Sequence, residues 1–183
     1  MAIKTFSVGE VLTASDTNTY LANAGLVYVT STTVGSAVSS VTVNNCFSST
    51  YDNYRIVYGG GTGSTNITLS LQLGASTTGY YGVVTYATYA AATTPLSAGD
   101  NNAAAWTTVG YAGANFTQAS FDLINVNLAR WTTINAASWA ATTVAGTFNG
   151  VHQVATAYTG FTLGVNTGTL TGGTITVYGY RKA

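Results

Sequence analysis

The segment Ile67-Thr-Leu-Ser-Leu-Gln-Leu73 carries apolar side chains at every second position, with polar side chains between them. Successive side chains of a β-strand point to opposite faces, so this alternation predicts a strand over residues 67–73 with one buried face and one hydrated face. Strands of this kind are typical of antiparallel sheets. The segment therefore favours an antiparallel β fold.

Similar short runs rich in Val, Ile, Thr and Tyr, separated by Gly and Asn, occupy the chain from Leu26 onward. This composition is typical of strands joined by turns. Besides 67–73, the predicted strands are 26–30, 38–43, 54–58, 83–89, 105–111, 120–128, 131–139, 142–148, 151–158, 161–165 and 174–180. Short strands at regular spacing, with almost no helical pattern, predict an all-β domain, an antiparallel β-sandwich or jelly-roll-like fold. A parallel α/β sheet is excluded, because the helices that would connect its strands are missing.

Two glycine-containing dipeptides predict tight turns. Asn149-Gly150 lies between two apolar runs and predicts a β-hairpin, because a type I′ turn requires positive φ at both central positions. Gly172-Gly173 precedes the last strand and predicts a turn of the same kind. The longest predicted loop covers residues 87–105 and contains Pro95.

One short helix is predicted near the N-terminus. Thr13-Ala-Ser-Asp16 matches the capping-box pattern and Gly25 supplies a C-terminal stop, so a helix is expected over residues 14–24. An isolated helix this short is marginal in water and needs a surface to lie against. We therefore divide the chain into an N-terminal docking segment, residues 1–25, and a β-sandwich head domain, residues 26–183.

Charged residues are scarce: the 183 residues include five Lys and Arg, five Asp and Glu, and one His. Acid–base and metal chemistry draw on clustered His, Cys and carboxylate side chains, so we expect no enzyme and assign no catalytic, cofactor-binding or metal-binding residue. A calcium ion held by loops around Asp100 is kept as an alternative. The basic residues are too dispersed for nucleic acid, and no apolar run is long enough to span a bilayer, so neither partner is expected.

Four polar or reactive side chains have simple structural interpretations. His152, the only histidine, is expected on a strand surface and without a catalytic role, because no nucleophile elbow accompanies it. Cys46 stands before an apolar Phe and is expected in the core. Asp52 and Arg55 are expected to form a local ion pair that orients a turn.

Thirteen Tyr and three Trp supply aromatic rings with a polar edge, which suit both cores and contact surfaces. Most are expected to line the core or to pair across strands. Those near the longest predicted loop are the best candidates for contact with an external ligand: Tyr80, Tyr81, Tyr86 and Tyr89.

Three segments of the sequence carry a resemblance to a protein family. The stretch Thr5-Phe-Ser-Val-Gly-Glu-Val-Leu-Thr-Ala-Ser-Asp-Thr-Asn18 resembles the pattern F-x-x-G-E/D-x-L-T-A-x-D-x-N, found at the N-terminus of many small structural proteins of tailed bacteriophages. Phe47-Ser-Ser-Thr-Tyr-Asp-Asn-Tyr-Arg-Ile-Val57 and Val177-Tyr-Gly-Tyr-Arg181 are similar to segments of the same proteins. The resemblance spans nearly the whole chain, and the family has no catalytic residues to carry over.

The resemblance implies a non-enzymatic structural protein of the virion, assembled in the cytoplasm of the bacterial host. Its N-terminal segment is expected to dock onto other virion proteins through apolar side chains: Phe6, Val8, Val11, Leu12, Tyr20 and Leu21. A neutral surface rich in Tyr and small residues favours a homo-oligomer, predicted as a trimer. A tail appendage or fibre-like adhesin, with a host-surface glycan as a further partner, is preferred. A capsid decoration (cement) protein is the alternative, and a free carbohydrate-binding module is the second alternative.

Overall fold

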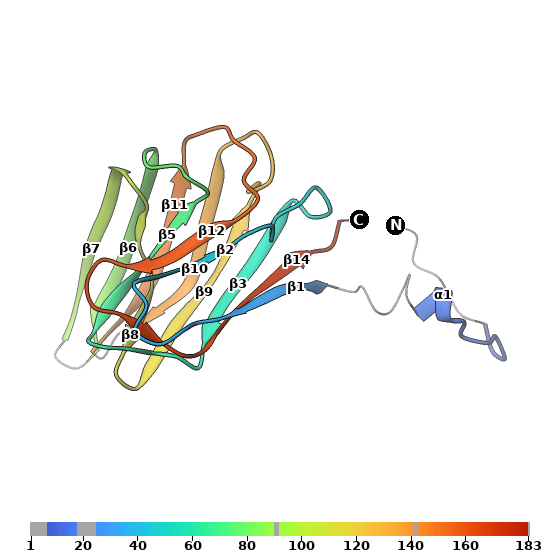
Figure 1. The fold of residues 1–183 in the computed structure, drawn as a ribbon, viewed down its shortest axis with the longest axis horizontal. Helices are drawn as coiled ribbons and strands as arrows, with labels where there is room; N and C mark the ends of the chain where they lie inside the picture. The colour runs from blue at the N-terminus through green and yellow to red at the C-terminus, as the bar shows by residue number, and fades with distance from the viewer. Residues whose placement is uncertain (1–6, 18–24, 90–91, 141–142, 183) are drawn as a thin grey trace.

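The computed structural model describes residues 7–17, 25–89, 92–140 and 143–182, and most of them belong to antiparallel β structure (Figure 1). Strands make up 58% of the structure. An average globular domain has roughly 20–25%. The all-β class predicted from the sequence is confirmed.

Fourteen strands follow one another along the described parts of the chain. Their bounds are β1 Leu26–Thr33, β2 Ser40–Val43, β3 Asn53–Gly59, β4 Thr62–Gly63, β5 Ile67–Leu73, β6 Tyr80–Thr88, β7 Ala92–Ala103, β8 Trp106–Gly113, β9 Phe116–Ile124, β10 Thr132–Ala140, β11 Val144–His152, β12 Phe161–Val165, β13 Leu170–Thr171 and β14 Thr174–Tyr180. One helical turn, α1, spans Ala14–Asp16. No helix among the described residues is long and apolar enough to cross a membrane.

Hydrogen bonding arranges twelve of these fourteen strands in two runs, and the other two, β4 and β13, pair with each other in a separate two-stranded sheet. One run, the long layer, has the order β1-β14-β3-β9-β10-β11-β6-β7, and the other, the short layer, has the order β2-β12-β5-β8. β8 also pairs with β9, so the two layers are joined. Figure 1 shows β2 and β12 of the short layer passing across strands of the long layer. This strand order does not establish a jelly-roll connection pattern, which stays a prediction.

The core lies between the two layers, on the inward side of each strand. Every apolar side chain of β5 is buried and every polar one between them is partly exposed, which confirms the strand predicted over residues 67–73. Across the core, Trp106 of β8 meets Tyr80 of β6 edge-on, with ring centroids 5.1 Å apart. Each fully buried large apolar side chain stabilises the fold by about 1.5–3 kcal/mol.

The hairpin predicted at Asn149-Gly150 is wrong. Both residues lie inside β11, where Gly150 pairs with Ile134 of β10. A Cβ atom on Gly150 would lie only 2.6 Å from Nε1 of Trp106, so this glycine lets the indole approach the sheet and does not supply a positive φ. Gly172 and Gly173 have the positive φ expected of such a turn, 70° and 82°, but they form no hairpin, because β13 pairs with β4 whereas β14 pairs with β1 and β3.

The loop predicted over residues 87–105 is also wrong, since most of it forms β7. β7 pairs with β6 and ends the long layer, so its other side is a sheet edge. Pro95 lies within β7 and misled the prediction. Proline lacks a backbone N–H, but an edge strand tolerates it because only one side of the strand must pair.

Candidate functional site

The first candidate site is the predicted docking segment, of which the structure describes residues 7–17, called here the N-terminal arm. Three of its aliphatic side chains are open to solvent: Val8 is 109% exposed, Val11 78% and Leu12 50%. The other predicted docking residues lie outside the described residues: Phe6, Tyr20 and Leu21. The arm therefore presents apolar side chains that the core does not cover.

Local hydrogen bonds define the backbone of the arm. Glu10 N donates to Ser7 O at 3.1 Å, and Ser7 N donates to Glu10 Oε2 at 3.1 Å. Asp16 N donates to Thr13 Oγ1 at 3.1 Å, and Thr13 N donates to Asp16 Oδ2 at 3.1 Å, which confirms the predicted capping box. Residues 18–24 of the predicted helix lie outside the described residues. The arm thus has local order without core contacts at its aliphatic side chains.

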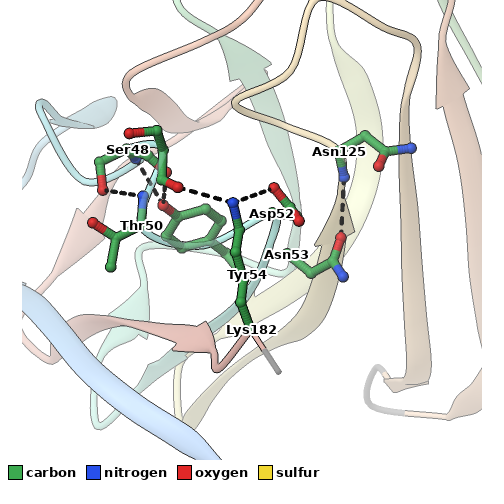
Figure 2. A network of polar contacts seen from close by, with 8 residues as sticks. Ser48, Thr50, Asp52, Asn53, Tyr54, Asn125 and Lys182 are labelled. Carbon is green, nitrogen blue, oxygen red and sulfur yellow. Dashed lines mark hydrogen bonds and ion pairs between the residues drawn. The ribbon is translucent and has the colours of Figure 1, made fainter. Parts of the chain in front are cut away.

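A polar network fixes the C-terminal end of the chain close to the start of β1. Arg181 N donates to Gly25 O at 3.2 Å, which ties the residue before β1 to the residue after β14. Lys182 Nζ lies 2.7 Å from Asp52 Oδ1 and donates to Ser49 O at 2.9 Å (Figure 2). The expected ion pair between Asp52 and Arg55 is therefore wrong, because Asp52 pairs with a lysine far away in sequence.

The loop between β2 and β3 is held from its other side by a buried tyrosine. Tyr54 Oη accepts from Ser48 N at 2.7 Å and donates to Ser48 O at 2.8 Å (Figure 2). Asn53 Oδ1 accepts from Asn125 N at 3.2 Å, which links the loop to the end of β9. These hydrogen bonds hold the loop between β2 and β3 in place.

The tyrosines predicted to contact an external ligand are not one surface cluster. Tyr80 is fully buried, so it cannot touch such a ligand and that assignment is corrected. Tyr81 and Tyr86 are partly exposed, and Tyr89 is 67% exposed. Tyr80 faces the core because it lies on the inward side of β6, where its hydroxyl accepts from Leu73 N at 2.7 Å. Alternation along β6 places Tyr81 on the opposite face.

His152 is also in the core, which corrects its expected surface position. Its side chain is 0% exposed, its ring stacks on Tyr80 at 4.1 Å between centroids, and Nε2 shares a 2.7 Å hydrogen bond with Tyr158 Oη. The expected inward and outward positions along this strand were wrong by one residue. His152 pairs with Tyr80 across β11 and β6, and both side chains point into the core. Nδ1 is buried without a hydrogen-bond partner in the described structure. Burial lowers the pKa of His152, and the Gly79 backbone offsets part of this effect.

A second polar cluster lies on the face of the long layer that points away from the core. Tyr180 Oη donates to Asp122 Oδ1 at 2.6 Å, and Arg55 Nε lies 3.9 Å from the same oxygen. Arg55 Nη2 also donates to Ser120 Oγ at 3.5 Å. Burial and the Asp122 carboxylate raise the pKa of Tyr180, so its hydroxyl keeps its proton and remains a donor. This cluster could not be predicted from the sequence, because strand pairing brings its members together from distant positions in the chain.

The structure offers little support for a metal centre among the residues it describes. Within them no group of three His, Cys, Asp or Glu side chains comes together. Asp100, the centre of the alternative calcium site, lies on β7 and not in a loop. Its carboxylate accepts from Thr107 N at 2.9 Å and from Thr107 Oγ1 at 2.6 Å.

Comparisons of the chain with protein-family models, with curated proteins and with solved structures give no match. The similarity of three segments to phage structural proteins therefore stays a prediction.

Proposed function

We propose that this chain is a non-enzymatic structural protein of a tailed-phage virion, which docks by its N-terminal segment and exposes an oligomeric β-sandwich of jelly-roll-like type. The observation that carries the proposal is the N-terminal arm, with Val8, Val11 and Leu12 open to solvent. Exposed apolar side chains grouped on one segment are typical of a binding surface. The phage-like sequence pattern covers the same segment.

The local hydrogen bonds of the arm support a docking role. Its turn at Ser7–Glu10 and its capping box at Thr13–Asp16 are already formed by local hydrogen bonds. Less conformational entropy is then lost when the arm binds, since part of its backbone is already ordered. The ion pair between Lys182 and Asp52 and the backbone hydrogen bond to Gly25 would keep the start of β1 fixed to the head domain when the arm is docked.

Within the virion, a tail appendage or fibre-like adhesin is preferred over a capsid decoration protein. A homo-oligomer, proposed as a trimer, fits the near absence of charge and the exposure of Leu26 on edge strand β1. The number of copies per particle separates the two locations, because decoration of a head needs many more copies than a tail appendage.

The test is incorporation into particles by the full-length chain carrying Val8→Ser, Val11→Ser and Leu12→Ser together. Leu96→Ser is the matched control, because Leu96 is a comparably exposed aliphatic side chain on β7, at 48%. Both proteins should keep the unfolding transition of the unmodified chain. Supplied to phage that lack the gene, only the control should enter purified particles. Equal incorporation of the triple variant would overturn docking by the arm.

A further inference from the structure

A continuous row of paired residues crosses the long layer on the face that points away from the core. Strand pairing places one residue from each of its eight strands in this cross-strand row: Tyr28, Tyr178, Arg55, Asp122, Asn135, Asn149, Val83 and Gly99. Residues directly opposite each other in antiparallel strands lie on the same face. The residues on either side of each row member along β3 and β14 are buried, which confirms that the row faces outward.

The middle of the cross-strand row is a set of planar polar side chains. Asn135 and Asn149 are opposite each other and both exposed. Neither amide makes a side-chain hydrogen bond within the described residues, so each keeps donors and acceptors for an external molecule. Next to them, Asp122 is held in place by Tyr180 and Arg55. The row therefore combines two available amides with a carboxylate of fixed orientation.

One end of the row is aromatic. Tyr28 is 60% exposed and meets Tyr178 edge-on, with ring centroids 6.4 Å apart. Tyr28 Oη lies 3.0 Å from Ser31 Oγ, which fixes the tilt of the ring. A tyrosine held in this way offers an apolar ring face beside polar groups.

We propose that the cross-strand row binds a neutral oligosaccharide, with its chain lying across the strands. Sugar hydroxyls match the amides of Asn135 and Asn149 and the carboxylate of Asp122, and the apolar face of a sugar ring matches Tyr28. Neighbouring strands are about 4.8 Å apart, which is close to the length of one sugar unit, so successive sugars meet successive side chains of the row. This inference rests on the adhesin part of the proposed function and names the class of its ligand.

The charge of the row selects a neutral ligand. Its only charged members, Arg55 and Asp122, carry opposite charges and face each other. Nucleic acid would need several unpaired basic side chains. A protein partner would need an apolar centre to its interface, whereas the centre of this row is made of amides and an ion pair.

The test is binding of the full-length chain to an array of neutral tri- to hexasaccharides built from glucose, galactose, mannose and N-acetylglucosamine. The affinity for any hit is then measured by calorimetry. Asn135→Ala, Asn149→Ala and Tyr28→Ala should each weaken binding by about tenfold, because each removes one contact. Asn115→Ala is the matched control, since Asn115 is exposed and lies outside the row. This control should bind as the unmodified chain does.

Absence of binding to every oligosaccharide would overturn the proposal, and so would equal losses in the row and control variants. If the row variants instead dissociate an oligomer in sedimentation experiments, the face is an interface between copies and the proposal fails. None of these results affects docking by the arm. Docking is tested separately by incorporation of the Val8, Val11 and Leu12 variant, so the two proposals can fail independently.

Discussion

The buried imidazole of His152 should make the stability of the protein depend on pH between 7 and 5. In the folded chain, burial lowers the pKa of His152 from its ordinary 6.5, and no carboxylate pairs with the ring in the described structure. The side chains that contact the ring are Tyr80, Trp106 and Tyr158. Below pH 6.5 the unfolded chain takes up a proton that the folded chain does not, so stability is complete above this pH and is lost as the pH falls.

The size of the effect follows from proton linkage. The free energy of unfolding falls by at most 1.36 kcal/mol per pH unit in this window, so the loss between pH 7 and pH 5 has an upper limit of about 2 kcal/mol, reached when the folded ring stays neutral throughout. Since the chain has one histidine, no other imidazole contributes. Urea unfolding followed by tryptophan fluorescence at half-unit steps of pH measures the loss directly.

His152→Gln is the control, because glutamine can still bond to Tyr158 Oη but does not titrate. The variant should be less stable at pH 7, since the ring stacking on Tyr80 is lost. Its stability should then be nearly constant from pH 7 to pH 5. A slope in the variant equal to that of the unmodified chain would refute the assignment of the pH dependence to His152.

Three further predictions concern the core and the assembly. Leu71 is fully buried and pairs with Leu163 and Trp106, so Leu71→Ala should lower the free energy of unfolding by about 2–5 kcal/mol in the same urea assay. A loss below about 1 kcal/mol, which is typical of a well-tolerated core substitution, would contradict the packing described. Burial raises the pKa of Cys46 to about 12, so iodoacetamide should modify the folded protein at pH 8 far more slowly than the unfolded protein; equal rates would show that the thiol is accessible. Light scattering should report a multiple of 18.8 kDa, and a monomer mass at every concentration would contradict the proposed oligomer.

Patterns contained within one segment were predictable from the sequence. The alternation over residues 67–73, the capping box at Thr13 and Asp16 and the positive φ of Gly172 and Gly173 depend on neighbouring residues, and the structure shows all three. These features follow from local side-chain periodicity, local hydrogen bonding and backbone φ.

Features set by distant packing were missed. The glycine at position 150 looked like part of a turn, but its role is to make room for Trp106. The inward orientation of His152 depends on its pairing with Tyr80. The cross-strand row needs the register of all eight strands of the long layer, and an error of one residue in any pair would move a side chain to the opposite face.

The central claim, that this chain is a component of a phage particle, is tested most directly by quantitative mass spectrometry of density-gradient-purified particles from the host strain that carries the gene. The account predicts peptides of this chain in the particle band at a constant ratio to the other structural proteins. A few to a few dozen copies per particle would indicate a tail appendage, and hundreds would indicate head decoration. Peptides abundant in the lysate but absent from the particle band would contradict the account.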